Sequence, residues 1–503
     1  MNTNLTTIFG PPGCGKTTKL LSIIQDLLSK GVSPQHIGFI TFTKKAAEEA
    51  KERASQSLGI KEDDLKWFRT LHSLTFNRLG IDRDSVLSFY DMRKIAESVG
   101  TKISFKGVTE DGTVTGMEKG DRLFFMEGLS RIMRKPIKEI WKMFPNDDIP
   151  IIEISHFQKT LNKYKTAYSK IDFTDMLDLF VQEKPSPRLS YLIVDEAQDL
   201  SAIQWEVVEI LASQCNHVWV AGDDDQAIYN WAGAEAWRMS KLEGEKVYLT
   251  QSYRVPRKVQ KLAMKLTKRI KTRENKTYLP RNEEGVVKYI GDLAQLDMSK
   301  GSWLLLARNL FMLDPYVLHC RQHGFVYSAR VGTPVRNESL AAVVNWEALR
   351  RGEDILVKDA LKVYAMLEMN KGFSYGSKAK LSRERPDRKI EIEELRSRFG
   401  LQVTDVWHKS LTKLPEHDRE YFLIARKKGE KLLATPRINI NTMHGVKGGQ
   451  ADNVVLCLDM AQRTYDESLL DPDSEARVWY VGITRAKQNL YILLPETNYS
   501  YTL

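Results

Sequence analysis

Long apolar runs are missing from this 503-residue sequence: no stretch of about 18 apolar residues is long enough to cross a membrane. The first nine residues, MNTNLTTIF, also lack the basic start and the apolar core of a secretory signal. We therefore expect a cytoplasmic protein with no membrane partner.

Cysteine is scarce as well. The four cysteines are Cys14, Cys215, Cys320 and Cys457. They are scattered and form no paired spacing, so neither a disulfide framework nor a cysteine-based metal centre is supported. His319 and His323 lie four residues apart around one of these cysteines, a spacing that could hold a metal on a helix. Because no further ligand cluster accompanies the pair, the pattern favours a structural or surface role.

Acidic residues are outnumbered: 75 Lys and Arg face 65 Asp and Glu, for a net charge of +10. This balance favours an anionic partner such as nucleic acid. The excess is concentrated in residues 254–281, which hold eleven Lys or Arg and one acid, Glu274. Two interpretations stay open for this basic stretch, a nucleic-acid contact and the solvated face of a helix.

Short apolar, β-rich segments alternate with helical patterns in two groups. The first group is LTTIFG, IGFITF, YLIVDE, HVWVAGD and VYLT; the second is VVKYI, WLLLAR, NVVLCLD and LYILLP. Such alternation predicts parallel sheets covered by helices, and hence an α/β fold with two domains. We expect residues 1–80 and 170–250 to form the first domain and residues 251–332 and 436–503 the second. Residues 81–169 and 333–435 are mostly helical in pattern and are predicted to be insertions.

The segment IFGPPGCGKTTKL reads as a strand, a glycine-rich loop and a helix. Gly10, Gly13 and Gly15 would let backbone N–H groups curl around phosphate at the start of the helix. Lys16 would reach the β- and γ-phosphates, and the hydroxyl of Thr17 would bind Mg²⁺.

A second acidic segment, YLIVDEAQD, follows downstream. Asp195 ends an apolar strand and can hold Mg²⁺, while Glu196 can orient and deprotonate the attacking water. Phosphoryl transfer also needs positive charge near the γ-phosphate. Arg254 in LTQSYR and Arg485 in YVGITRAK are candidates, although either could be a surface arginine.

Eight segments, taken in order, resemble the motor motifs of superfamily 1 DNA helicases of the UvrD/Rep type. They are GPPGCGKTT, TFTKKAAEEAKER, RTLHS, LIVDEAQD, AGDDDQAIYNWAGA, LTQSYR, TMHGVKGGQADNVVL and YVGITRAK, from residue 10 to residue 487. The resemblance implies two RecA-like motor domains, each with a mainly helical insertion. It further implies an ATP-dependent DNA helicase that uses Mg²⁺ and moves 3′ to 5′ on single-stranded DNA.

The resemblance also implies roles for individual residues. The catalytic set is Lys16, Asp195, Glu196, Gln226, Arg254 and Arg485, with Gln226 sensing the γ-phosphate. The nucleotide set is Gly10, Gly13, Gly15, Lys16, Thr17, Thr18, Tyr253 and Gln450, with Thr17 and Asp195 on Mg²⁺. The DNA-binding set is Phe42, Thr70, His72, Tyr229, Trp231, Thr442, His444 and Lys447. Aromatic faces would stack on bases, and hydroxyls and Lys would hold backbone phosphates.

The loop AGDDDQAIYNWAGA would join both activities. Asp223 and its acidic neighbours are expected to end a strand beside Mg²⁺ and the triphosphate, with Gln226 next to them. Tyr229 and Trp231 follow closely and would lie beside the DNA strand. Such a loop would couple hydrolysis to the release of a base.

Several positions depart from the family pattern. Only nine residues precede Gly10, whereas a glutamine segment that reads adenine usually lies about twenty residues before the loop. Thr18 replaces an arginine, Gln450 replaces a glutamate that contacts the ribose, and Ala232 replaces an arginine. We therefore expect weaker discrimination among nucleoside triphosphates than is usual in the family.

Alternatives to a helicase remain. One is a DNA-stimulated ATPase or translocase that remodels protein–DNA complexes without processive unwinding; a binding module with a degenerate ATP site is disfavoured by the intact catalytic set. The expected partners are single-stranded DNA and single-strand/duplex junctions, and the expected state is a monomer or weak self-association.

Overall fold

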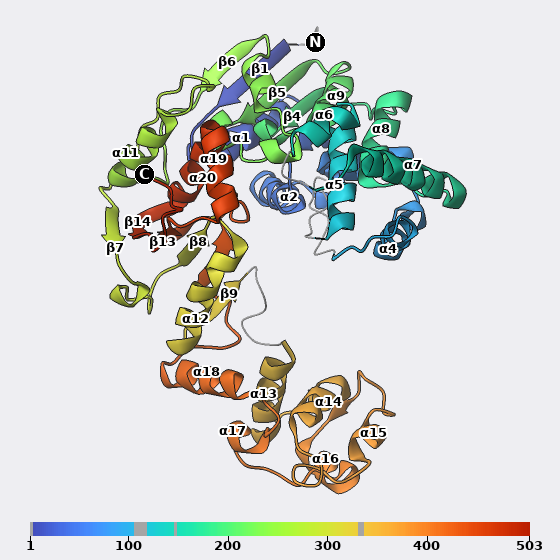
Figure 1. Ribbon diagram of the computed structural model, residues 1–503, viewed down its shortest axis with the longest axis vertical. Helices are drawn as coiled ribbons and strands as arrows, with labels where there is room; N and C mark the ends of the chain where they lie inside the picture. The colour runs from blue at the N-terminus through green and yellow to red at the C-terminus, as the bar shows by residue number, and fades with distance from the viewer. Residues whose placement is uncertain (1–3, 105–117, 145–147, 330–336) are drawn as a thin grey trace. The chain divides into compact units, whose positions relative to one another are not determined.

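The computed structural model describes residues 4–104, 118–144, 148–329 and 337–503 (Figure 1). The chain divides into two compact units. Unit 1 is Met1–Glu283 with Leu470–Tyr480, and unit 2 is Glu284–Leu469 with Val481–Leu503. Across the described ranges, no helix combines the length and apolarity needed to cross a bilayer.

Unit 1 is built on a six-stranded parallel sheet with the order β3-β2-β4-β5-β1-β6. The strands are β1 (Asn4–Phe9), β2 (Ile37–Ile40), β3 (Phe68–Arg69), β4 (Tyr191–Val194), β5 (His217–Gly222) and β6 (Glu245–Tyr248). In the register, Phe9 pairs with Gly222 and Val194 with Val220. The carboxyl ends of the central strands β1, β4 and β5 therefore meet at one edge of the sheet, where the candidate site lies.

Helices cover both faces of this sheet, which explains why its central strands β1, β4 and β5 are buried along most of their length. One face, with Ile8 and Ile193, packs against α1 (Lys16–Ser29) and α2 (Lys44–Leu58). The other face, with Phe9 and Val194, packs against α3 (Leu71–Leu79), α8 (Phe173–Glu183) and α9 (Ala202–Ala212). Unit 1 also contains the short α10 (Ala236–Ser240) and α11 (Arg257–Thr267).

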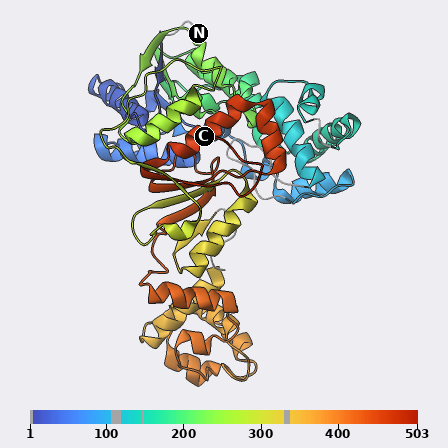
Figure 2. The same ribbon diagram turned by 60° about the vertical axis from the view of Figure 1, so that its left-hand side comes forward.

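Between α3 and α8, the residues that the structure describes are mainly helical, as expected for an insertion. This stretch contains α4 (Phe89–Ser98), α5 (Lys119–Ile132), α6 (Ile137–Lys142) and α7 (Ile151–Tyr168), the blue to teal helices of Figure 2. These helices share an apolar cluster around Ile95, Phe124 and Phe157. Arg131 of α5 ties the helices to α8, because it donates to both carboxylate oxygens of Asp172, the residue that caps α8.

Unit 2 contains a second six-stranded parallel sheet, with the order β7-β14-β13-β8-β12-β9. Its strands are β7 (Val286–Ile290), β8 (Trp303–Ala307), β9 (Tyr327–Ala329), β12 (Ile438–Thr442), β13 (Ala451–Cys457) and β14 (Ala486–Leu493). Helix α12 (Asp314–Gln322) follows β8, and α19 (Gln462–Leu470) follows β13. The next helix, α20 (Pro472–Ile483), belongs to unit 1 up to Tyr480.

The remaining helices of unit 2 form a separate run in the sequence. They are α13 (Asn337–Arg350), α14 (Val357–Met366), α15 (Ser377–Leu381), α16 (Ile392–Phe399), α17 (Trp407–Ser410) and α18 (Glu416–Lys427), with a two-stranded antiparallel ladder of β10 (Ile355–Leu356) and β11 (Lys389–Ile390). Their buried aromatic residues, such as Trp346 and Trp407, share one apolar cluster with the inner strands of the sheet.

The predicted fold class, two α/β domains with parallel sheets and mainly helical insertions, is confirmed. All nine predicted strands are present, while β3, β9, β12 and the ladder were not anticipated. The domain bounds given above stay a prediction.

Candidate active site

The glycine-rich loop joins β1 to α1 at the carboxyl edge of the first sheet. Gly13 and Gly15 have left-handed backbone conformations, with φ of 75° and 80°, which favour glycine. Lys16 folds back across the loop and donates from Nζ to the carbonyl oxygen of Gly10 at 2.8 Å. Burial alone would lower the pKa of Lys16, but the neighbouring thiol of Cys14 and the carboxylates of Glu196, Asp223 and Asp195 raise it. The ammonium group is thus kept charged where phosphates would bind.

Thr17 and Asp195 come together from α1 and the end of β4. The Thr17 hydroxyl donates to Asp195 Oδ2 at 3.3 Å. The pKa of Asp195 is raised to about 7, first by burial and then by the adjacent Glu196. A hydroxyl and a carboxylate oxygen are ligands that suit Mg²⁺, and a cation here would keep the Asp195 carboxylate ionised. The donor set therefore fits the predicted metal.

Glu196 has an unusual backbone for a residue other than glycine. Its φ of 53° and ψ of 38° are left-handed, a conformation that costs about 1 kcal/mol or more and recurs at functional sites. Its carboxylate accepts from Gln198 Nε2 at 2.5 Å. The other end of the Gln198 amide, Oε1, accepts from the backbone N–H of Asp223 at 3.0 Å. Gln198 therefore links the strand-end acids to the loop after β5.

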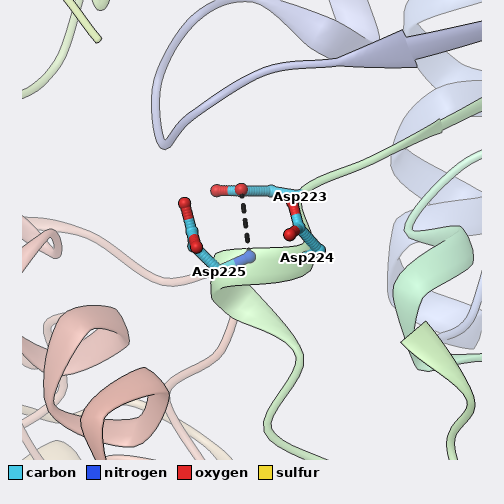
Figure 3. Close-up of side chains that lie close together, drawn as sticks. All are labelled: Asp223, Asp224 and Asp225. Carbon is cyan, nitrogen blue, oxygen red and sulfur yellow. Dashed lines mark hydrogen bonds between the residues drawn. The ribbon is translucent and has the colours of Figure 1, made fainter. Parts of the chain in front are cut away.

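The loop after β5 begins with Asp223, Asp224 and Asp225, whose side chains lie close together (Figure 3). Asp223 Oδ1 accepts from the backbone N–H of Asp225 at 3.3 Å, and Asp223 Oδ2 accepts from Gln226 Nε2 at 2.8 Å. All four residues are buried. Gln226 is thus held directly by the first aspartate.

Two cations from the segment after α11 neutralise these acids. Lys276 Nζ lies 2.8 Å from Asp223 Oδ1 and 3.0 Å from Asp225 Oδ2, and it also pairs with Asp224. Arg273 makes a two-pronged contact with Asp225, at 2.8 Å and 2.6 Å. Since these oxygens are engaged by side-chain cations, we interpret the triplet as an ion-pair cluster, not a metal site. Asp223 is engaged by Lys276 in the same way, so the expectation that these acids lie beside Mg²⁺ stays a prediction for all three.

The segment LTQSYR lies directly against the phosphate loop. Ser252 Oγ donates to the carbonyl oxygen of Pro12 at 2.8 Å, and the backbone N–H of Tyr253 donates to the carbonyl of Gly13 at 2.8 Å. A Cβ on Gly13 would lie 2.4 Å from Arg254 Cβ, so only glycine permits this approach. Tyr253 itself is 73% exposed and is available to a ligand.

Arg254, next to the phosphate loop, has one buried donor without a partner in the described ranges. Its Nε is inaccessible to solvent and has no hydrogen-bond partner among the described residues. Burial lowers the pKa of Arg254, against the attraction of Tyr278 and Glu196. A buried donor without a partner is costly unless an acceptor, such as an anion, completes it. Its position beside the phosphate loop fits the predicted role at a triphosphate.

The predicted DNA-binding residues of unit 1 include two aromatic stacks. Phe42, just after β2, stacks on Tyr229 with ring centres 5.3 Å apart. Trp231 stacks on Phe125 of α5 at 6.2 Å and is 43% exposed. Thr70 caps α3 by accepting from the backbone N–H of Ser73 at 3.2 Å.

His72 in this set is buried and meets Phe173 edge-on at 5.9 Å. Thr70 and His72 therefore also have structural roles within unit 1, because Thr70 caps α3 and His72 packs against Phe173.

The remaining predicted residues lie in unit 2. Thr442 ends β12 and accepts from the N–H of Gly445 at 3.1 Å, which starts the turn that carries His444 and Lys447. Arg485 is buried, and it donates to the carbonyls of Val481 at 2.9 Å and Gly449 at 3.3 Å.

Gln450 is exposed and precedes β13. The roles assigned to this residue, to Thr18 on α1 and to the unit 2 set stay predictions.

Sequence inspection missed Lys276, Arg273, Gln198 and Ser252. Three adjacent acids after a buried strand were a usable signal for the first two, because buried carboxylates require counter-charges. Part of the basic stretch therefore turns inward.

The four cysteines are free. His319 and His323 stack with ring centres 4.2 Å apart and belong to no cluster of three potential metal ligands in the described part of the chain.

Two models of known protein domains match the chain. The sequence model of the UvrD/REP helicase N-terminal domain matches residues 2–246, and that of the UvrD-like helicase C-terminal domain matches residues 367–497. Together the two matches cover about three quarters of the chain.

Individual relatives match over about half of the chain. They include the ATP-dependent DNA helicase PcrA of Bacillus subtilis (strain 168), 29% identical over 295 residues, which are 54% of this chain and 39% of that protein. PcrA of Staphylococcus aureus (strain Mu50 / ATCC 700699) is 27% identical over 303 residues, 55% and 40% of the two chains. The ATP-dependent DNA helicase Rep of Salmonella typhimurium is 29% identical over 276 residues, 50% and 39%. The matches thus span about two fifths of the length of these relatives.

Proposed function

This chain belongs to the UvrD/REP helicase family, and from that premise we propose that it is an ATP-dependent DNA helicase. It would hydrolyse Mg²⁺-ATP, move along single-stranded DNA in the 3′ to 5′ direction and separate duplex at a junction. The observation that carries the proposal is the meeting of Lys16, the Thr17–Asp195 pair and the unpaired Nε of Arg254 around one glycine-rich loop.

Hydrolysis would use these groups in distinct roles. Backbone N–H groups of the loop and the α1 N-terminus hold the phosphates, and Lys16 leaves the Gly10 carbonyl to reach them. Thr17 and Asp195 would hold Mg²⁺, which neutralises the developing charge on the phosphate oxygens. Glu196 would orient the attacking water and accept its proton.

The two arginines and Gln226 complete the proposed reaction. Arg254 and Arg485 would stabilise the charge of the transition state, and Gln226 would read the γ-phosphate. Tyr253, exposed beside the loop, would lie against the adenine ring.

Coupling to DNA would pass through the loop after β5. Gln226 ends the short 3-10 helix η5 (Asp224–Gln226), and Trp231 lies in the next one, η6 (Asn230–Ala232). A shift of Gln226 on hydrolysis would therefore reach the Tyr229–Phe42 and Trp231–Phe125 stacks over a few residues. Stacking holds a base without reading its sequence, as translocation requires.

Strand separation tests the proposal. The full chain is incubated with ATP and Mg²⁺ and with duplexes that carry a single-stranded tail at either the 3′ or the 5′ side, and a translocation assay is run beside it. We expect separation of the 3′-tailed duplex. Separation of only the 5′-tailed duplex would contradict the direction, and translocation without separation would favour the alternative, a DNA-stimulated ATPase that remodels protein–DNA complexes.

A further inference from the structure

We propose that Lys276 is a positioning residue for ATP hydrolysis, acting through Asp223 on the amide of Gln226. The inference rests on the proposed function and adds a residue to it. Lys276 lies outside both family matches, which end at residue 246 and resume at residue 367. Its ion pairs are with Asp223, Asp224 and Asp225, so we infer an indirect effect on hydrolysis.

The geometry places Lys276 and Gln226 on the two oxygens of one carboxylate. Lys276 Nζ donates to Asp223 Oδ1 at 2.8 Å, and Gln226 Nε2 donates to Asp223 Oδ2 at 2.8 Å. Rotation of the Asp223 carboxylate would therefore carry the Gln226 amide with it. Lys276 fixes that rotation, with help from the backbone N–H of Asp225 at 3.3 Å.

Charge explains why a lysine is needed here. The side chains of Asp223, Asp224 and Asp225 are 0%, 7% and 1% exposed, and that of Lys276 is 3% exposed. An ammonium group has three donors, and this one meets all three carboxylates. Arg273 forms its ion pair with Asp225. Without Lys276, Asp223 would keep a buried charge with no cation from this segment.

The segment that carries Lys276 is itself fixed within unit 1. The Asp473 carboxylate accepts from the backbone N–H groups of Lys271 at 2.9 Å and Thr272 at 3.1 Å. Arg477 donates to the carbonyls of Asp224 at 2.9 Å and Thr272 at 2.5 Å. Through Asp473 and Arg477, these hydrogen bonds join the Lys276 segment to the acidic loop, and so they help to set the position of Lys276 relative to Asp223.

A purely structural role for Lys276 is the competing explanation, and charge balance separates the two. Lys276→Met leaves three buried acids against one cation and is expected to lower stability. Adding Asp224→Asn removes one of the two carboxylates that repel Asp223 and keeps the side-chain shape, so the double variant should recover part of the urea midpoint that Lys276→Met loses. The double variant still lacks the hydrogen bond from Lys276 to Asp223. The Asp223 carboxylate would then hold the Gln226 amide less firmly.

The test measures DNA-stimulated ATP hydrolysis by the full chain, with Lys16→Ala as the inactive reference. For Lys276→Met/Asp224→Asn we expect kcat to fall about tenfold to a hundredfold, because small misplacements of a catalytic group have effects of this size. KM for ATP should stay within about twofold, since a contact made in the transition state affects kcat. Lys30→Met, which breaks an exposed ion pair with Asp26 at 2.6 Å, is the control and should match the wild type.

A cycle with Gln226→Ala shows whether Lys276 acts through that residue. We expect no further loss of kcat when Gln226→Ala is added to the double variant. Losses that multiply, or a double variant with wild-type kcat, would overturn the inference while leaving the helicase proposal intact. A double variant that does not fold, beside a folded Lys276→Met, would overturn the charge-balance reasoning. A wild-type chain without ATPase activity would overturn both proposals.

Discussion

Ser252 joins the phosphate loop to the Arg254 segment, and replacing it with alanine tests that junction. Its hydroxyl is fully buried and makes three contacts: it donates to the carbonyl of Pro12 at 2.8 Å and accepts from the N–H groups of Arg254 at 3.2 Å and Val255 at 3.1 Å. Ser252→Ala removes all three with the loss of a single atom. The predicted result is a looser junction and slower ATP hydrolysis, because Arg254 loses its fixed backbone.

The magnitude follows from the groups left behind. A buried donor or acceptor that loses its partner costs about 1–3 kcal/mol, and partial relaxation of three such groups gives roughly 2–4 kcal/mol in total. The control is Ser240→Ala, which removes a single exposed bond from Oγ to the Trp237 carbonyl at 2.9 Å. Ser240→Ala is expected to lower the free energy of unfolding by at most about 0.5 kcal/mol.

Hydrogen exchange measured by mass spectrometry reads the effect locally. The Arg254 and Val255 amides should exchange about 5 to 30 times faster in Ser252→Ala, which corresponds to 1–2 kcal/mol of lost protection. Urea unfolding measures the total loss of unfolding free energy in the same variant. Exchange at these amides that equals the wild type, or a loss of stability no larger than that of Ser240→Ala, would refute the reasoning.

Three further predictions concern chemistry, DNA and nucleotide choice. Glu196→Gln should lower ATP hydrolysis by about 10²–10⁴-fold with nucleotide binding retained, measured with a fluorescent ATP analogue, and near-normal turnover would exclude Glu196 as the base. Trp231→Ala should weaken single-stranded DNA binding by about 1–3 kcal/mol in a fluorescence anisotropy titration. The control is Trp237→Ala, at a similarly exposed tryptophan of α10, which should leave the affinity unchanged. Equal losses of affinity in the two variants would contradict a stacking role for Trp231. Hydrolysis rates for ATP, GTP and CTP should differ by less than about tenfold, since Gln450 and Thr18 replace the usual contacts, and a strong preference for ATP would show that other groups read the base.

The parts of the site that follow a strand could be predicted from the sequence. Strands β4 and β5 are almost wholly apolar, and β1 ends in the apolar pair Ile8 and Phe9, so these strands and the polar residues at their carboxyl ends were identifiable. Because such ends share one edge of a sheet, the approach of Thr17 to Asp195 across 178 residues was predictable. The strand β12, ININT, was missed because polar residues alternate with its apolar ones, although Ile438 and Ile440 are fully buried.

The counter-charges could not be assigned in the same way. Lys276 is one of eleven basic residues in its stretch, and nothing in the local pattern distinguishes it from Lys265 or Lys268, which are exposed. Its partner Asp223 lies 53 residues away and on another loop. The left-handed backbone of Glu196 was equally hidden, because non-glycine residues adopt that conformation only when tertiary contacts impose it.

The most direct measurement is ATP hydrolysis by the full chain with and without single-stranded DNA, beside Lys16→Ala. If ATP is cleaved at the glycine-rich loop and cleavage is coupled to DNA, the wild type will hydrolyse ATP faster when DNA is added. Lys16→Ala will bind DNA with unchanged affinity and show no hydrolysis. Hydrolysis that DNA does not stimulate, or a Lys16→Ala variant that retains it, would contradict that coupling.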